Sequence, residues 1–315
     1  TAVKLIRASK VNWVTLDIDS FFLESQKEGV EMNYEGERGY NPVAVTCAEI
    51  KTPLAGLFRA GNASPMGNLA GLIKLVLPAL QGMRIRLRSD SAGFQAGVVR
   101  VLREAGADYT ITARKDAAVM EAIRSIPAGI WKRYEGGAWE DRETEIAETV
   151  HAFGDADVPA QRMIAIRWRK KEPDLFQDPH EYHAVVTSFD GWSAGVVMQF
   201  HRTRQDGSEN VNKELSGGIG LSKLPCRLIQ ANAAHFQVAL LAYTVFAATR
   251  QLALPESWQK LTIKTVRFRL IRLAGVVARR SRRVWLKLSE GYLYRQEFED
   301  ARRRILGFSE DLSYG

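Results

Sequence analysis

Acidic residues stand at three separate places in this sequence where the surrounding pattern would fix their positions. Two of them, Asp17 and Asp19, lie in the segment NWVTLDIDS over residues 12–20. The alternation is typical of a strand, and it puts both carboxylates on the face opposite Leu16 and Ile18. Two carboxylates on one face repel each other, so they favour a divalent metal ion or a basic partner. If the strand lay at the edge of a sheet, water could solvate both of them instead.

The second acidic position is Asp90 in RSDSAGFQ, directly after a strand predicted for RIRLR over Arg84–Arg88. Functional groups of α/β folds commonly lie at such strand-to-helix turns. The alternative is that Asp90 is only the N-cap of the helix that follows.

The third acidic position is Glu209 in SENVNKEL, at the start of a predicted helix. Arg202 and Arg204 lie just upstream of it, and Lys213 follows one helical turn later. A solvated helix start with a Glu209–Lys213 pair is the alternative interpretation. The three acidic positions are too far apart for a local motif, so only a fold that brings them together could make one site.

The elements that would position these acids follow an α/β order. Two strands after the first one complete an antiparallel run of three, and later strands then alternate with helices. The predicted strands are Asn41–Ala48, Leu54–Arg59, Arg84–Arg88 and Asp108–Ala113. The predicted helices are one capped by Ser64 with Pro65 at its first position, Ala92–Ala105 closed by Gly106, and Asp116–Ile126 capped by Asp116. This order fits an α/β domain with an antiparallel edge, as in ribonuclease-H-like folds.

The second half of the sequence changes character twice. Residues 127–190 alternate apolar and polar residues between Gly, Asp and Pro breaks, which predicts a β-rich insertion. Helices are predicted again at Trp192–Phe200, Ser208–Leu215 and Gln230–Leu252. The tail then interleaves seven arginines with apolar residues between 267 and 283, close to Trp285. This pattern suits phosphate contacts, with a solvated helix face as the alternative.

Composition favours a polyanionic partner. The 315 residues include 44 Lys and Arg against 36 Asp and Glu, which gives a net charge of +8. An acidic lipid surface is the competing partner, but no basic amphipathic anchor stands out. Cys47 and Cys226 each lie in apolar surroundings and read as buried free thiols in a reducing compartment. The longest apolar run, about residues 238–248, is too short to span a bilayer and predicts a core helix.

Two further patterns carry little chemistry. His180 and His183 have a ligand-like spacing, but three residues apart on a strand they would face opposite sides, and no cysteine lies near them. The glycine-rich segment SGGIG over residues 216–220 is better explained as a helix terminator than as a nucleotide-binding loop.

Several short motifs together carry a family resemblance. TLDIDS, GYNPVAV, FRAGNAS, RSDSAGFQ, YHAVVTS and SENVNKEL, followed by LPC and ANAAHFQVALLAY, occur in the order seen in DDE transposases of bacterial insertion sequences. The sequence resembles the group called transposase DDE domain group one over nearly the whole chain. The resemblance implies a ribonuclease-H-like mixed sheet flanked by helices, with a β-rich insertion before the last catalytic acid. The implied divisions are the first part of the core at 1–126, the insertion at 127–190, the last core helices at 191–255 and a basic helical region at 256–315.

The resemblance also assigns roles to the acidic residues. It places the first acid at Asp19, because Asp-Ser matches the family pattern there, and Asp17 stays the alternative. The second acid falls on Asp90 and the third on Glu209. Asp19, Asp90 and Glu209 would hold two Mg²⁺ ions, which Mn²⁺ can replace. The expected DNA-binding residues are Arg202, Arg204, Lys213, Arg267, Arg269, Arg279, Arg280, Arg282 and Arg283.

Around the third acid the sequence departs from the family signature of Tyr, Arg, Glu and Lys. His201 stands at the Tyr position, and Arg204 matches the Arg with one extra residue before Glu209. Ser216 stands where the Lys is expected. These departures affect the DNA contacts of the signature more than they affect Glu209 itself.

The implied function is Mg²⁺-dependent cleavage and strand transfer of double-stranded DNA at insertion-sequence ends. The partners would be the terminal inverted repeats and the target DNA, held by a homodimer on paired ends in the bacterial cytoplasm at the nucleoid. The alternatives are a catalytically decayed DNA-binding relative and a ribonuclease-H-like nuclease outside transposition. Relatives usually carry a further N-terminal region that helps to bind element ends, so we expect this chain to be a fragment.

Overall fold

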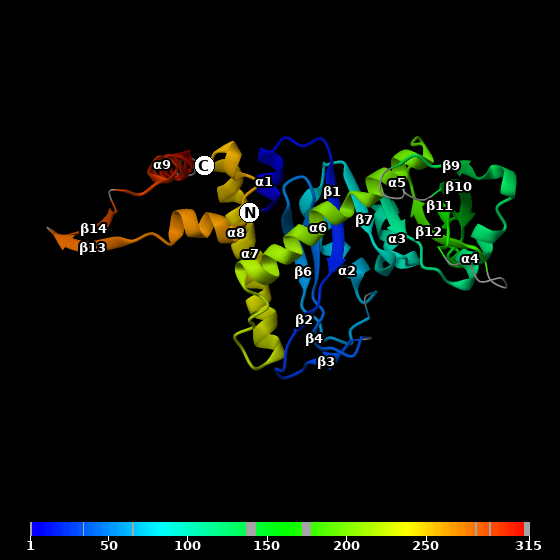
Figure 1. Cartoon of the computed structure of the whole chain (residues 1–315), viewed down its shortest axis with the longest axis horizontal. Helices are drawn as coiled ribbons and strands as arrows, with labels where there is room; N and C mark the ends of the chain where they lie inside the picture. Colours follow the sequence, from blue (N-terminus) through cyan, green and yellow to red (C-terminus); the bar gives the residue numbers. More distant parts are fainter. Residues whose placement is uncertain are drawn as a thin grey trace.

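The computed structural model describes residues 2–33, 35–64, 66–136, 143–171, 178–280, 282–289 and 291–311 (Figure 1). At residues 205–209, 280 and 308–311 it describes the backbone alone. The body is a mixed sheet covered by helices, and a β-hairpin extends away from it at one end of the molecule.

Nine strands of the described chain form one sheet in the order β6-β5-β1-β7-β8-β12-β11-β10-β9. Antiparallel pairing joins β6, β5 and β1, whereas β7 and β8 run parallel to β1. These five strands have the ribonuclease-H-like arrangement, so the expected α/β fold class is confirmed. In sheet order the bounds are β6 Thr52–Leu57, β5 Val43–Cys47, β1 Val14–Ser20, β7 Ile85–Ser89, β8 Asp108–Thr112, β12 His180–Thr187, β11 Gln161–Arg169, β10 Thr144–His151 and β9 Lys132–Arg133.

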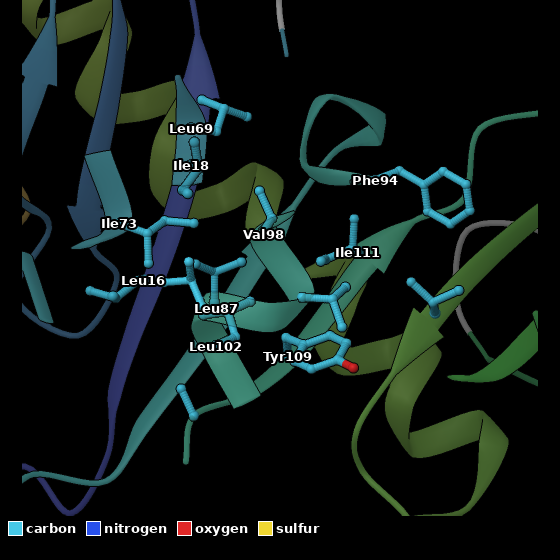
Figure 2. Packing of buried hydrophobic residues seen from close by; sticks show 14 of the residues in the cluster. Leu16, Ile18, Leu69, Ile73, Leu87, Phe94, Val98, Leu102, Tyr109 and Ile111 are labelled. Atoms are coloured by element: carbon cyan, nitrogen blue, oxygen red, sulfur yellow. The ribbon is translucent and has the colours of Figure 1, made fainter. Parts of the chain in front are cut away.

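Alternation along β1 divides its side chains between the two faces of the sheet. Leu16 and Ile18 are buried in a cluster that includes Ile73 and Val98 from helices on one face (Figure 2). Asp17 and Asp19 belong to the opposite face, which α5 and α6 cross (Figure 1). The helices of the body are α1 Ala2–Ala8, α2 Leu69–Val76, α3 Ala96–Glu104, α4 Ala117–Arg124, α5 Ala194–Arg202, α6 Arg204–Lys213 and α7 Ile229–Leu252.

The segment predicted as a β-rich insertion is β-rich, and it continues the main sheet. Strand β12 pairs antiparallel with β8, with Val186 opposite Ile111. Strands β11, β10 and β9 then follow in antiparallel order. A separate buried cluster, which includes Ile164 and Met198, fixes this part of the sheet to α5. The four strands therefore lengthen the core sheet beyond β8.

The basic C-terminal region is only partly helical, which corrects the prediction for residues 256–315. Helices α8, Ile263–Val266, and α9, Arg295–Asp311, flank a hairpin of β13, Gly275–Arg280, and β14, Arg283–Leu288. The apolar residues of the hairpin include Val276, Val277 and Val284, and β-branched side chains favour extended strands. Arg282 at the turn has a φ of 61°, as a tight hairpin connection requires.

Helix boundaries agree with the capping signals in one case and differ in another. Asp116 caps α4 as predicted, and its side chain accepts a hydrogen bond of 3.0 Å from the amide of Val119. Helix α2 begins only at Leu69, after Asn68 with a φ of 57°, so Ser64 is not its cap. The predicted first helical position, Pro65, lies outside the described residues.

Helix α7 agrees with the helix predicted at Gln230–Leu252 and begins one residue earlier, at Ile229. Of the helices that the structure describes, α7 is the one long and apolar enough to cross a membrane, by length and composition alone. One side of it is buried against the protein, with Phe236, Leu240 and Tyr243 in a shared cluster. Its Gln237 also donates a hydrogen bond of 2.9 Å to the carbonyl of Gly56 in β6. These contacts are those of the core helix expected from the sequence.

Short secondary elements complete the described chain. A small sheet of β2 Leu23–Glu24, β4 Arg38–Tyr40 and β3 Glu31–Met32 lies between β1 and β5 in sequence. The short helical turns are η1 Leu77–Leu80, η2 Ser91–Gly93, η3 Ala128–Ile130, η4 Glu214–Ile219, η5 Glu256–Trp258 and η6 Arg267–Ile271.

Both cysteines are free, as the sequence predicts, but only one is buried. Cys47 lies in the core, and its Sγ donates to Glu49 Oε2 over 3.3 Å. Burial raises the pKa of the Cys47 thiol well above its usual range. Cys226 is partly exposed.

Candidate active site

The fold brings two of the predicted acids to one edge of the sheet. Parallel pairing of β1 and β7 sets Ile18 opposite Ser89. Asp19 and Asp90 are the residues that follow on each strand, so both lie at the carboxyl ends of neighbouring strands. Asp90 Oδ1 accepts a hydrogen bond of 3.0 Å from the amide of Ala92. The N-cap role considered for Asp90 is therefore also present, at a short helical turn.

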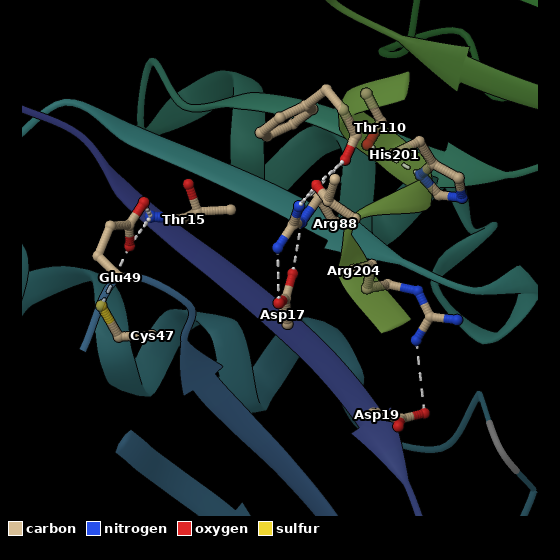
Figure 3. Close-up of polar contacts among 11 residues, drawn as sticks. Thr15, Asp17, Asp19, Cys47, Glu49, Arg88, Thr110, His201 and Arg204 are labelled. Atoms are coloured by element: carbon tan, nitrogen blue, oxygen red, sulfur yellow. Dashed lines mark hydrogen bonds and ion pairs between the residues drawn. The ribbon is translucent and has the colours of Figure 1, made fainter. Parts of the chain in front are cut away.

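Helix α6 crosses the sheet over β1 and supplies contacts to Asp19 (Figure 3). Asn212 Nδ2 donates a hydrogen bond of 3.0 Å to Asp19 Oδ2, and Arg204 Nη1 lies 3.5 Å from Asp19 Oδ1. The Asp19 side chain keeps 19% of its surface exposed. It is thus held by a neutral donor and a cation while water can still reach it.

The third predicted acid, Glu209, has a side chain outside the described part of the structure. Its backbone lies in α6, three residues before Asn212. Positions three apart share one face of a helix. The position of Glu209 therefore lies on the face of α6 that also carries Asn212, the residue bonded to Asp19.

Asp17 has a different environment from Asp19. Its side chain is fully buried, and Arg88 binds both oxygens, with Nε 2.7 Å from Oδ1 and Nη2 2.8 Å from Oδ2 (Figure 3). Burial raises the pKa of the Asp17 carboxyl to about 6, although the Arg88 guanidinium opposes this shift. The sequence left three possibilities for this carboxylate: a divalent metal ion, a basic partner or solvation at a sheet edge. The structure gives Asp17 a basic partner, Arg88. Solvation on an edge strand is wrong, because β1 lies between β5 and β7.

Arg88 also connects the sheet to the corner between α5 and α6. Its Nη1 donates a hydrogen bond of 3.0 Å to the carbonyl of Phe200 and another to Thr203 Oγ1. Thr203 directly precedes Arg204, the first residue of α6. The Asp17–Arg88 pair therefore fixes the start of α6. From there the helix crosses the acidic edge, the end of the sheet that carries Asp19 and Asp90.

His201, at the Tyr position of the family signature, is an internal residue. Its ring nitrogens lie 2.9 Å from Thr110 Oγ1 and 2.9 Å from Thr112 Oγ1, and its ring centroid is 6.1 Å from that of His183. Burial lowers the pKa of His201 well below 6.5 and that of His183 to about 4. Both rings are neutral at physiological pH, so His201 pins α5 to β8 and is not exposed for a DNA contact.

The other cations predicted around the third acid point to different places. Arg202 lies near Tyr134 on the β-rich side, where its charge opposes the raised pKa of that phenol. Lys213 lines a pocket of about 460 Å³ together with Lys51, Arg250 and Lys260. Among these three predicted cations, Arg204 is the one for which the described structure gives a contact with Asp19.

A second pocket of about 460 Å³ adjoins Asp90. Its walls come from four of the sequence motifs that carry the family resemblance. The lining includes Ser20 of TLDIDS, Asn41 of GYNPVAV, Asn62 of FRAGNAS, and Asp90 with Ser91 of RSDSAGFQ. Arg59 holds this region together, since Nε donates to the carbonyl of Asn41 and Nη1 to those of Ser64 and Gly67.

The arginines of the C-terminal region lie away from the acidic edge (Figure 1). Arg267 and Arg269 belong to the turn η6, and Arg269 lies over the rings of Trp258 and Tyr294 at 5.2 and 4.8 Å. Arg279, Arg280, Arg282 and Arg283 surround the tip of the β13–β14 hairpin. The structure does not bring these residues together with Asp19 and Asp90.

Two residues that support the acidic edge are absent from the predicted set. Arg88 could have been found from the alternation of RIRLR, which gives a buried strand with cations on one face. Asn212 could have been found from its helical spacing after Glu209. Among the described side chains, no three of Asp, Glu, His and Cys form a group that could hold a metal ion, and Glu209 is not among those side chains.

A mixed sheet with acids at adjacent strand ends and a helix crossing above them defines a ribonuclease-H-like protein. The family described as Transposase DDE domain group 1 matches residues 3–309, and the chain belongs to this family of transposases.

A comparison with solved structures finds similarity to the piggyBac transposase in a cryo-EM synaptic complex with hairpin DNA. The TM-score is 0.43 at 12% identity, over 77% of this chain and 55% of that chain. This chain therefore spans about half the length of that transposase. A comparison with curated proteins finds no match.

Proposed function

We propose that this transposase cleaves DNA at the ends of an insertion sequence and joins them to target DNA in a Mg²⁺-dependent reaction. The observation that carries the proposal is the placement of Asp19 and Asp90 at adjacent strand ends, under the helix that bears Glu209. Membership of the DDE family supports this class of reaction. Asp19 is the first acid of the proposal, because both oxygens of Asp17 bind Arg88.

The residues at this edge fit Mg²⁺. Carboxylate oxygens are hard ligands of the kind that Mg²⁺ prefers, and Asp19 and Asp90 offer them from neighbouring strands. Asp19, Asp90 and Glu209 are the proposed ligands. Two such ions, when bound, stabilise the attacking and leaving oxygens of an in-line phosphodiester displacement.

The surrounding side chains have supporting roles in the proposal. Asn212 fixes the orientation of the Asp19 carboxylate through a hydrogen bond of 3.0 Å. Arg204, 3.5 Å from Asp19, balances part of its charge and can also bind a phosphate of the DNA. Arg202 and Lys213, which lie elsewhere around α5 and α6, are proposed to contact DNA outside the cleavage point.

The partners in the proposal are duplex DNA of the terminal inverted repeats and of the target. A homodimer on paired ends would act in the bacterial cytoplasm at the nucleoid. The net charge of +8 supports the choice of a polyanionic partner. Mn²⁺ is expected to replace Mg²⁺, since both are hard cations that accept oxygen ligands.

The test is cleavage of labelled element-end DNA with Mg²⁺ or Mn²⁺, together with calorimetric titration of Mn²⁺. Asp19→Asn, Asp90→Asn and Glu209→Gln should each abolish cleavage and weaken Mn²⁺ binding. Asp157→Asn is a matched control, because Asp157 is 79% exposed in a loop. DNA binding without cleavage by the unmodified protein would identify a decayed relative. Cleavage of any duplex without joining would identify a nuclease outside transposition.

A further inference from the structure

The hairpin of β13 and β14 is a two-stranded sheet that does not pair with any other strand of the described chain. It projects from the body beyond α8 (Figure 1). An isolated two-stranded hairpin is marginally stable in water, and three or more strands or a packed face are normally needed. Val277, Trp285 and Leu286 are nevertheless 65%, 53% and 61% exposed. A binding partner would cover these apolar side chains.

The charge of this region selects the chemistry of the partner. Residues 262–289 contain nine Lys and Arg and no Asp or Glu. A surface of one sign repels a second copy of itself and attracts a polyanion. Arg279, Arg282 and Arg283 are all exposed at the tip, where they can reach phosphates or base edges. Duplex DNA is the occupant that this distribution favours.

The two faces of the hairpin combine arginines with small and branched apolar side chains. Val277 and Leu286 face each other across the strands, and the next pair on the same face is Arg279 and Val284. The other face carries Ala278 opposite Trp285. The major groove, about 12 Å wide, admits a two-stranded ribbon. It also presents the acceptors of guanine, which arginine reads, and the methyl group of thymine, which apolar side chains contact.

We propose that the β13–β14 hairpin inserts as a ribbon into the major groove of duplex DNA. Arg279, Arg282 and Arg283 bind phosphates and guanine edges, while Val277 and Leu286 contact thymine methyl groups. This inference rests on the proposed DNA function and adds the element, the groove and the base groups that it touches. It assigns the arginines of the tail to a strand ribbon instead of a helix face.

The first experiment measures fluorescence anisotropy with a labelled mixed-sequence duplex of about 30 base pairs over a range of salt concentrations. The triple variant Arg279→Gln/Arg282→Gln/Arg283→Gln should lose at least tenfold in affinity. Its slope of log affinity against log salt should fall by about 3, near 0.9 for each lost phosphate contact. The control Lys27→Gln/Lys74→Gln/Lys171→Gln removes three exposed cations elsewhere and should keep most of the affinity. Equal slopes for the two triple variants would overturn the inference.

The second experiment identifies the groove. Dimethyl sulfate modifies guanine N7 in the major groove and adenine N3 in the minor groove, so interference by each is read in one reaction. We expect interference at guanine N7 that disappears in the triple variant. Interference confined to adenine N3, or unchanged by the variant, would contradict insertion into the major groove.

The third experiment tests the apolar contact and the alternative occupant. A duplex with uracil in place of thymine lacks the methyl group and should bind severalfold more weakly. The variant Val277→Ser/Leu286→Ser should bind both duplexes equally. If this variant instead changes the mass in light scattering from dimer to monomer and leaves DNA affinity unchanged, the hairpin is a protein interface and the inference is wrong.

The two proposals can fail separately. Cleavage that depends on Asp19 together with normal DNA binding by the triple arginine variant would reject the ribbon and keep the transposase chemistry. Binding that depends on the hairpin in a protein unable to cleave would reject the chemistry and keep the ribbon.

Discussion

Arg88 binds both carboxylate oxygens of Asp17 at 2.7 and 2.8 Å inside the protein, and the Asp17 side chain has no exposed surface. The same guanidinium holds the carbonyl of Phe200, at the end of α5. This ion pair therefore joins the central strand to the helix corner that precedes α6. In the proposal, the Asp17–Arg88 pair positions α6, whereas Asp19 is the carboxylate that binds metal at the acidic edge.

Removal of one partner of this buried pair should strongly destabilise the protein. Arg88→Met leaves the Asp17 carboxylate buried without its cation, and such losses cost about 3–5 kcal/mol. Urea denaturation measures the change in the free energy of unfolding. Arg124→Met is the control, because its nearest carboxylate oxygen, on Asp178, is 3.8 Å away and its side chain is 61% exposed. A loss below about 1 kcal/mol for Arg88→Met would show that the pair does not anchor the corner.

Asn212 should affect cleavage more than stability. Asn212→Ala removes the donor to Asp19 Oδ2 and leaves that carboxylate free to turn toward Arg204. We expect cleavage to fall by about tenfold or more, the lower part of the range for disturbed metal-ligand support. Single-turnover cleavage with Mn²⁺ titration checks this expectation. The control Ser216→Ala, four residues further along the chain, should leave both measurements unchanged.

Stability should fall as the pH is lowered from 7 toward 4. Burial keeps the folded pKa of His183 at about 4 and that of His201 well below 6.5, so only the unfolded chain takes up these protons below about pH 6.5. Asp17 acts in the opposite direction between its folded pKa of about 6 and its usual 3.8, because the folded form binds that proton first. Burial also lowers the pKa of His151, so three histidines oppose one carboxyl. The net difference is about one to two protons, or about 1.4–2.7 kcal/mol per pH unit.

Urea unfolding between pH 7.5 and 5 measures this slope. In His183→Gln, the free energy of unfolding should change less steeply with pH, by the equivalent of up to one proton. The reason is that the variant lacks one of the histidines that stay neutral in the folded protein. An unchanged slope in this variant would contradict the assigned pKa values.

Gly61 should not tolerate a side chain. A Cβ at this position would lie 2.2 Å from the carbonyl oxygen of Glu31 and 2.6 Å from that of Gly39, both backbone atoms. Gly61→Ala should therefore displace the FRAGNAS loop from the small sheet and destabilise the protein by about 1–3 kcal/mol. Gly97→Ala is the matched control, because apart from its chain neighbours and its own helix backbone no atom would lie within 4 Å of the added Cβ. In α3 this control should be neutral or stabilising by up to about 1 kcal/mol. Differential scanning calorimetry compares the two.

Sequence patterns predicted the core strands because one face of β1, β5, β7 and β8 packs in the apolar core, while the other face carries polar and charged side chains such as Asp17, Arg88 and Thr110. They also predicted two helices. The capping residue Asp116 marked the start of α4, and a long, mostly apolar segment indicated α7. The α2 start was missed, since Ser64 and Pro65 imitate a capping signal that the chain does not use before Leu69. The hairpin was missed because its arginines outweighed its valines in a pattern that fits either a helix or a strand.

For the candidate site, the sequence indicated which acids to examine but not their environments. Asp17 and Asp19 are equivalent by alternation, and only the packing of Arg88 separates them. Likewise His201 and Arg204 are neighbours in sequence, yet one is enclosed by Thr110 and Thr112 and the other reaches Asp19. These differences depend on contacts between distant segments, which periodicity does not contain.

The way the long sheet ends has a consequence for the behaviour of the protein in solution. Unpaired edge strands act as templates for aggregation, and short length or positive charge blunts them. In the described chain, one edge is the two-residue strand β9, whose Lys132 and Arg133 are both exposed. The other edge is β6, where the Gln237 side chain of α7 donates a hydrogen bond to the backbone carbonyl of Gly56. The short cationic strand β9 and the bonded carbonyl of Gly56 therefore blunt pairing at these points. In the described chain, Ala147–His151 of β10 is the stretch of the enlarged sheet that extends beyond the cover of β9, so association of two sheets would begin there.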